Sequence, residues 1–178
     1  LEPAGDVAGD TFDFSVGRDV LHLSITDAMG HGLHSAVLAT VLVGALRNAR
    51  RRGVNLAEQV RLANEALCGF SDDGDFVTGQ VVRVDHASGT ARIMNAGHPL
   101  PILIREGRAE TVGLTPGFPF GGALDAEYHV QELELDVGDR LVFLTDGILE
   151  RNAADVNAME ILGQTRHLHP REAMQALT

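Results

Sequence analysis

Three aspartates in this sequence stand at the ends of apolar segments and close to a glycine. They are Asp10, Asp27 and Asp146. A carboxylate at the end of a strand, where glycine lets the backbone approach closely, supplies the oxygen ligands that a hard cation binds. A single aspartate of this kind is more often part of a turn, because its side chain hydrogen-bonds nearby backbone. Three of them in one small chain favour a metal site.

Polar side chains and glycines also follow two apolar segments. Residues 30–32, with the sequence GHG, come soon after Asp27, and residues 95–99, with the sequence NAGHP, follow a later segment. The second of these is equally compatible with a polar turn closed by proline. His31 and His34 are three residues apart. A zinc site would need thiolates or more histidines at close spacing, so these two do not indicate one.

The elements that position these residues follow from the spacing of apolar side chains. Residues 20–26 alternate apolar and polar, which predicts a half-buried strand, and residues 12–16 precede it across a turn at 17–19. From His34 onward, apolar residues recur at helical spacing. The arginines within 47–52 end this helix, where they oppose its macrodipole, and this reading is favoured over an anion site.

A second helix follows, and strands return after it. Asn55 is placed to cap this helix, whose inner face carries Leu56, Val60, Ala63 and Leu67. Further strands are expected at 77–85, 90–96, 100–104, 128–135 and 140–145. Consecutive strands with short connections pair antiparallel, so we expect two antiparallel sheets with helices laid against them, an α+β layered sandwich.

Length and composition limit the class of protein. The 178 residues are enough for one domain, spanning 1–178, and the net charge of −11 argues against a nucleic-acid binder, which needs clustered Lys and Arg. Cys68 is the single cysteine, which excludes an internal disulfide and agrees with a cytoplasmic location. No apolar run reaches the roughly 18 residues of a membrane span. The chain begins at Leu1 and not at Met, so we expect a piece of a longer regulatory protein.

Five segments of the sequence together resemble a known family. They are residues 7–10 (VAGD) with Asp13, 27–32 (DAMGHG), 76–78 (FVT), 95–99 (NAGHP) and 145–147 (TDG) with Glu150. In this order and spacing they resemble the metal-dependent 2C-type protein phosphatases, the PPM family. The similarity is to the bacterial branch of stage II sporulation protein E and of the phosphatases that act on anti-sigma-factor antagonists. It covers about residues 3–163, and the ordered set is far more specific than any one segment.

This resemblance implies a four-layer α-β-β-α sandwich with two divalent cations, Mn²⁺ or Mg²⁺, between the sheets. Asp27 would bridge both cations, and the carbonyl of Ala28 would bind one of them. Asp146 would bind the other cation, and Asp10 would hold metal-bound water. The cations would lower the pKa of a shared water for in-line attack on phosphorus, without a covalent phosphoenzyme. The residues that would shape the site are Gly30, His31, Gly32, Asn95, Gly97, His98 and Gly147.

The resemblance also implies a substrate and partners. The substrate would be phosphoserine or phosphothreonine on an anti-sigma-factor antagonist of the STAS type, and the partners an upstream sensor domain and a second copy of the chain. The alternative is an inactive phosphatase-like module that binds a regulatory protein. A metal-dependent nucleotide enzyme is disfavoured, because the sequence has no glycine-rich loop followed by Lys and Ser or Thr.

The chain departs from the family pattern in three ways. Ala8 replaces the first glycine of the family's Gly-Gly-Asp segment. Residues 1–178 show neither the family's opening strand nor its last strand, and they lack the carboxylate of an Asp-Asp-x-Thr segment beyond the final helix. With three carboxylates for two divalent cations, we expect these residues alone to hold one cation firmly and to hydrolyse phosphate esters poorly.

The two expected helices suggest a hypothesis about regulation. They lie between His34 and Phe70 and begin only a few residues after Asp27, so a shift in them would move a metal ligand. The equally favoured alternative is that they only cover the sheet. Under the first hypothesis, substitutions at Arg47 or Arg51 on the helix surface alter activity without altering stability.

Overall fold

The computed structural model describes residues 9–72, 74–146 and 158–175, which form two compact units. The first unit runs as far as His98 and resumes over Thr115–Glu134. The second comprises Pro99–Leu114 and the residues from Leu135 onward. Within the described ranges, no helix is long and apolar enough to cross a membrane.

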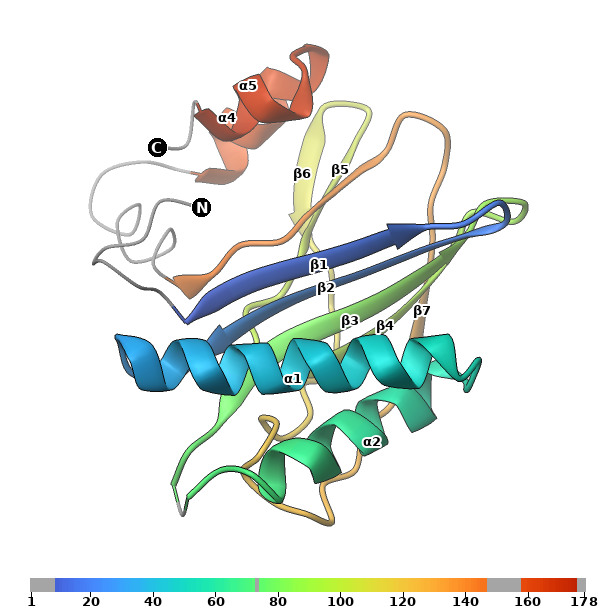
Figure 1. The fold of residues 1–178 in the computed structure, drawn as a ribbon. Coiled ribbons are helices and arrows are strands. Elements are labelled where there is room, and N and C mark those ends of the chain that lie inside the picture. Colours follow the sequence, from blue (N-terminus) through green and yellow to red (C-terminus); the bar gives the residue numbers. More distant parts are fainter. Residues whose placement is uncertain (1–8, 73, 147–157, 176–178) are drawn as a thin grey trace. The chain divides into compact units, whose positions relative to one another are not determined.

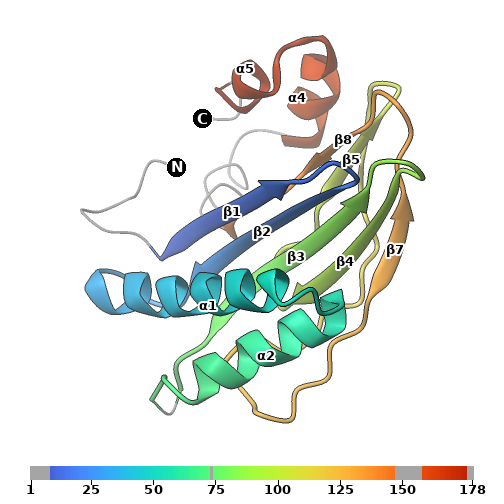
Figure 2. The same cartoon turned by 45° about the vertical axis from the view of Figure 1, so that its right-hand side comes forward.

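The first unit is an antiparallel sheet covered on one face by two helices. Its strand order is β1-β2-β3-β4-β7, with β1 at Asp10–Val16, β2 at Val20–Ala28, β3 at Val77–Asp85, β4 at Thr90–Ala96 and β7 at Gln131–Glu134. Helices α1 (Leu33–Arg51) and α2 (Leu56–Cys68) lie side by side on the same face of this sheet (Figures 1 and 2). The opposite face of the sheet is therefore the one that α1 and α2 leave uncovered.

The core of this unit lies between the sheet and the two helices. The alternation of strands sends every second side chain toward the helices. The helices contribute Leu38, Ala39, Leu42, Leu46, Leu56, Val60, Ala63 and Leu67, and the strands contribute Ala28, Val77, Val81, Met94 and Ala96. Phe120, from the segment that precedes β7, completes this cluster and is 1% exposed.

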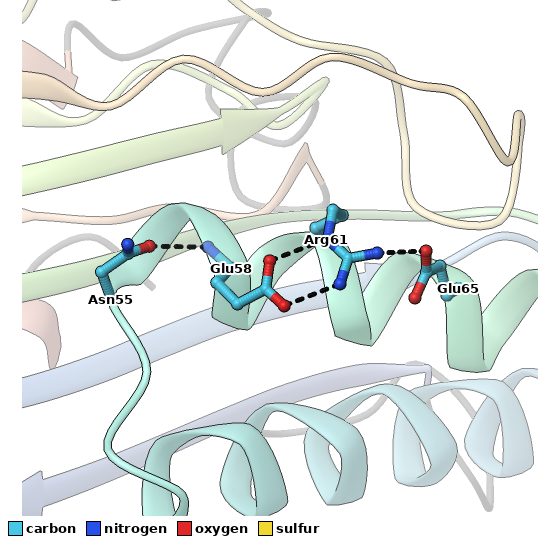
Figure 3. Close-up of polar contacts among 4 residues, drawn as sticks. All are labelled: Asn55, Glu58, Arg61 and Glu65. Atoms are coloured by element: carbon cyan, nitrogen blue, oxygen red, sulfur yellow. Dashed lines mark hydrogen bonds and ion pairs between the residues drawn. The ribbon is translucent and has the colours of Figure 1, made fainter.

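Helix α2 is stabilised at its start and along its outer face (Figure 3). The side chain of Asn55 accepts a hydrogen bond of 2.9 Å from the backbone N–H of Glu58, as predicted for a capping residue. Arg61 lies one helical turn after Glu58 and one turn before Glu65, and it forms ion pairs with both. Such exposed pairs contribute about 0.2–0.5 kcal/mol each to an isolated helix.

The second unit is a smaller sheet with short helices. Its strand order is β6-β5-β8, with β5 at Ile102–Arg105, β6 at Arg108–Thr111 and β8 at Arg140–Val142. Helix α4 covers Ala158–Gln164, a 3₁₀ turn follows at Thr165–His167, and helix α5 covers Pro170–Gln175. Ile102, Ile104, Leu144 and Leu162 form its core.

The predicted α+β class is confirmed, with two antiparallel sheets accompanied by helices. Five expected strands are corrected in extent. The strands expected at 12–16 and 20–26 are longer, at Asp10–Val16 and Val20–Ala28. The strand expected at 128–135 is only Gln131–Glu134, the one expected at 100–104 begins at Ile102, and the one expected at 140–145 ends at Val142. Tyr128 precedes the strand, and its ring stacks on Phe120 at a centroid distance of 5.5 Å.

Candidate metal centre

Two of the three predicted aspartates lie directly opposite each other in the large sheet. Asp10 begins β1, Asp27 is the next-to-last residue of β2, and the antiparallel register pairs them. Paired residues of an antiparallel ladder point to the same face, with their Cβ atoms about 4.5–5.5 Å apart. The adjacent Ala28 is buried against the helices, so both carboxylates belong to the opposite face of the sheet. Like charges at this spacing repel, and a divalent cation between them removes the repulsion.

The carbonyl of Ala28 lies against Gly9, the residue before Asp10, because glycine leaves room for it. A Cβ atom added at Gly9 would stand 2.6 Å from the Ala28 carbonyl oxygen, which is closer than real Cβ atoms come. The backbone N–H of Ala28 in turn donates to the carbonyl of Gly9 at 3.4 Å. Two carboxylates and a main-chain carbonyl are oxygen ligands of the kind that Mg²⁺ or Mn²⁺ binds. The residues present therefore fit the predicted cation.

The segment predicted to shape the site forms the turn from β2 to α1. Gly30 and Gly32 have φ of +82° and +84°, a backbone conformation that favours glycine, and Gly32 is the residue before the first turn of α1. His31, between them, is exposed. His34, in the first turn of α1, lies 2.9 Å from the carboxylate of Asp75. The structure thus joins His34 to the loop before β3, a contact that the spacing of the two histidines did not predict.

The segment at 95–98 lies on the same sheet and contacts the neighbour of Asp27. Thr78 of β3 is the register partner of Asp27 on the side away from Asp10, and its hydroxyl lies 2.9 Å from Nδ1 of His98. The side-chain amide of Asn95 donates to the carbonyl of His98, while the N–H of His98 donates to Oδ1 of Asn95, at 2.9 and 2.8 Å. The NAGHP segment is therefore a closed turn attached to the strand beside Asp27.

Asp13 holds α1 against the sheet. It lies three residues after Asp10 on β1, so its side chain points toward the helices, and only 8% of it is exposed. Its carboxylate accepts hydrogen bonds from Arg47 at 2.7 Å and from Arg50 at 3.1 Å. The hydrogen bond from Arg47 is the main reason that the pKa of Asp13 is lowered, with Arg50 adding to the effect against the cost of burial.

The third aspartate belongs to the second unit. Asp146 is exposed and follows the buried Leu144 and Thr145, beyond the end of β8 at Val142. Gly147 lies outside the described residues. Among the residues that the structure describes, no group of three or more His, Cys, Asp or Glu side chains gathers in metal-binding geometry. The pair of Asp10 and Asp27 is thus the nucleus of the candidate site.

Comparison with known proteins identifies the family. The sequence pattern of the family described as Stage II sporulation protein E (SpoIIE) matches residues 17–178. The chain belongs to the SpoIIE family. The phosphoserine phosphatase RsbU of Bacillus subtilis is 21% identical to it over 149 residues, which cover 83% of this chain and 44% of RsbU. This SpoIIE-family chain therefore spans less than half the length of that relative.

Solved structures give the same result for the fold. The RsbU and RsbW domains of Rv1364c from Mycobacterium tuberculosis match 99% of the SpoIIE-family chain and 51% of their own, with a TM-score of 0.82 and 25% identity. The PP2C phosphatase domain of SpoIIE from Bacillus subtilis, solved with a fragment of its regulatory domain, also has a TM-score of 0.82, at 20% identity. That match covers 97% of this chain and 52% of the other. The SpoIIE-family chain therefore has the fold of a PP2C phosphatase domain.

Two residues near this site, on opposite faces of the sheet, have contacts that the sequence did not reveal. Asp13 and Thr78 both lie in segments that carried the family resemblance, but no role was predicted for either. The strand register would have placed Thr78 beside Asp27, since the two residues sit at the paired ends of β2 and β3. Nothing in the sequence pairs Asp13 with Arg47, because they are 34 positions apart and meet only when α1 packs on the sheet.

Proposed function

We propose that this chain is the catalytic domain of a metal-dependent phosphatase that removes phosphate from serine or threonine of a regulatory protein. The observation that carries this proposal is the pairing of Asp10 with Asp27, beside a carbonyl for which Gly9 makes room. Membership of the SpoIIE family and the phosphatase names of its relatives support the same activity.

The residues divide the work of the site. Asp27, which lies in register between Asp10 on β1 and Thr78 on β3, would be the ligand shared by two cations, as the family resemblance implies. The carbonyl of Ala28 would complete the ligands of one cation, and Asp146 would bind the second. When bound, divalent cations neutralise phosphoryl oxygens and lower the pKa of water.

The proposed substrate and partners are those that the family resemblance implies, and the names of the relatives support them. The phosphatase RsbU and the Rv1364c domains that combine RsbU and RsbW point to control of a sigma factor. The proposed substrate is a phosphorylated anti-sigma-factor antagonist of the STAS type in the cytoplasm. The proposed cations are two Mn²⁺ or Mg²⁺ ions. An upstream sensor domain and a second copy of the chain are the proposed regulatory partners.

The test is hydrolysis of p-nitrophenyl phosphate and of a phosphorylated STAS protein, with Mn²⁺, by wild type and Asp27→Asn. We expect Asp27→Asn to lose about 100-fold or more of the rate, because the loss of a ligand exceeds that of a supporting residue. Asp19→Asn is the matched control, since it removes the same charge from the exposed turn at the other end of the β1–β2 pair. If wild type releases no phosphate from either substrate, the chain is a phosphatase-like binding module and the proposal is wrong.

A further inference from the structure

A row of polar groups crosses the sheet at the candidate metal centre. Asp10, Asp27 and Thr78 occupy matching positions on three adjacent strands, so their side chains share the face opposite α1 and α2. Thr78 is partly buried, and its hydroxyl is held at 2.9 Å by Nδ1 of His98. The group next to Asp27 is therefore a hydroxyl with a fixed orientation.

His98 cannot turn away from Thr78, because the chain around it is locked. Its side chain is 3% exposed, and both its N–H and its carbonyl are bound by the side chain of Asn95. Gly97, between them, has φ of +67°, and a Cβ there would stand 3.0 Å from the ring of Pro119. The turn thus places Nδ1 of His98 against the hydroxyl of Thr78, while Gly97 packs against Pro119.

We propose that Asn95 and His98 are positioning residues that act through Thr78 on Asp27, an inference that rests on the proposed function. A ligating carboxylate keeps its orientation when an outer hydrogen-bonding group fixes it, and the loss of such a group weakens metal binding. Thr78 stands at the correct register position to be that group for Asp27. His98 sets the direction of the Thr78 hydroxyl, and Asn95 sets the position of His98. None of these residues takes part in the transfer of phosphate itself.

The variants that test this inference remove single polar groups and keep shape. Thr78→Val keeps the β-branched side chain that suits a strand and removes the hydroxyl, whereas Thr78→Ser keeps the hydroxyl. His98→Leu removes the nitrogen that contacts Thr78, whereas His98→Asn retains a polar atom near the position of Nδ1. Thr90→Val is the matched control, because Thr90 also has a bonded hydroxyl but pairs with Glu134 in the same sheet, away from Asp27.

The readouts are the affinity for Mn²⁺, measured by calorimetric titration of the whole chain, and the free energy of unfolding in EDTA. We expect Thr78→Val and His98→Leu each to weaken Mn²⁺ binding about 10- to 100-fold, with Thr78→Ser and His98→Asn restoring most of it. His98→Leu should add nothing to Thr78→Val, because its effect passes through the same hydroxyl. Thr90→Val should bind Mn²⁺ as wild type does.

Two results would overturn the inference, and they are distinguishable from failure of the proposed function. Mn²⁺ affinity unchanged in Thr78→Val, or effects of the two substitutions that simply add, would show that Thr78 and His98 do not act as one unit. In either case, an Asp27→Asn variant that still loses Mn²⁺ leaves the proposed function intact. A wild-type chain that binds no Mn²⁺, or binds it equally well with Asp27→Asn, overturns both.

Discussion

Gly9→Ala tests whether the space beside the Ala28 carbonyl matters for the metal centre. The added Cβ would stand 2.6 Å from that oxygen, 3.1 Å from Cβ of Ser35 and 3.2 Å from Cβ of Ala28. The backbone of Gly9 is not in the left-handed region, so alanine is sterically blocked there without being conformationally forbidden. The nearest obstacle is main chain, which cannot rotate aside as a flexible side chain would.

The size of the effect follows from these distances. Ordinary contact begins at 3.4 Å, so the carbonyl of Ala28 and the start of β1 must separate by 0.8 Å. Bonds from Mg²⁺ to oxygen are about 2.0–2.1 Å long and tolerate changes of about 0.2 Å. We therefore expect the Ala28 ligand to be lost and Mn²⁺ affinity to fall about 10- to 100-fold. The crowding should also cost about 1–3 kcal/mol of unfolding free energy.

The assay is calorimetric Mn²⁺ titration together with urea unfolding in EDTA. Gly44→Ala is the control, because Gly44 lies within α1 and a Cβ there meets nothing within 4 Å. It should raise stability by about 1 kcal/mol through helix propensity and leave Mn²⁺ binding unchanged. Wild-type Mn²⁺ affinity in Gly9→Ala, alongside the expected stability loss, would show that the Ala28 carbonyl is not a ligand.

The remaining predictions concern the contacts between α1 and the sheet and the pH dependence of stability. Asp13→Asn should lower the unfolding free energy by about 1–3 kcal/mol, because it leaves two arginines without their carboxylate. Urea unfolding at pH 7 measures this loss. At pH 3 the unfolding free energies of the variant and wild type should differ less. The sign follows from the lowered pKa of Asp13, whose stabilising effect is present above pH 3.8 and lost as the pH falls through its lower folded value. Burial, with the charges of Arg50 and Arg83, lowers the pKa of His22, so wild type should lose stability as the pH falls below 6.5, and His22→Gln should lose less. An equal decline in both proteins between pH 7.5 and pH 5.5 would show that His22 is not responsible.

Arg47 lies on the helix surface as expected, but it is also attached to the sheet. Its guanidinium is bound to the buried carboxylate of Asp13, so a substitution there affects stability as well as any regulation. Arg51, which is exposed in the last turn of α1, fits the original expectation better. A regulatory test should therefore use Arg51, with Arg47 as a comparison whose stability has been measured.

The elements that carry the site were predictable because their patterns are strong. The turn after Val16 fixes the register of the β1–β2 hairpin, and this register brings Asp10 opposite Asp27. The position of the turn in the sequence is therefore enough to predict that Asp10 and Asp27 pair. By contrast, β6 at Arg108–Thr111 escaped prediction because it is a short, largely charged strand with no apolar alternation. Its pairing with β5 depends on the partner strand more than on its own side chains.

Contacts between distant segments were not predictable in this way. The link from Thr78 to His98 depends on a closed turn whose amide could equally have faced solvent. Likewise, Asn64 of α2 receives hydrogen bonds from the N–H of Gly121 and the hydroxyl of Tyr128, which fixes the loop between β6 and β7. These polar side chains have no periodicity, and their partners are chosen only once the chain has folded.

Asp13 anchors α1 near the C-terminal end of the helix, so a tilt about that anchor would displace the first turn of the helix. The helix has 19 residues, and its anchor at Arg47 is 14 residues from its first residue, Leu33. At 1.5 Å per residue this arm is about 21 Å long. A tilt of about 3° around the anchored end would carry Leu33 through about 1 Å. That displacement is larger than the tolerance of a metal–oxygen bond, and only four residues separate Leu33 from the end of β2 at Ala28. Under the hypothesis that the helices regulate activity, a small rotation imposed far from the carboxylates would be amplified where a cation would be held.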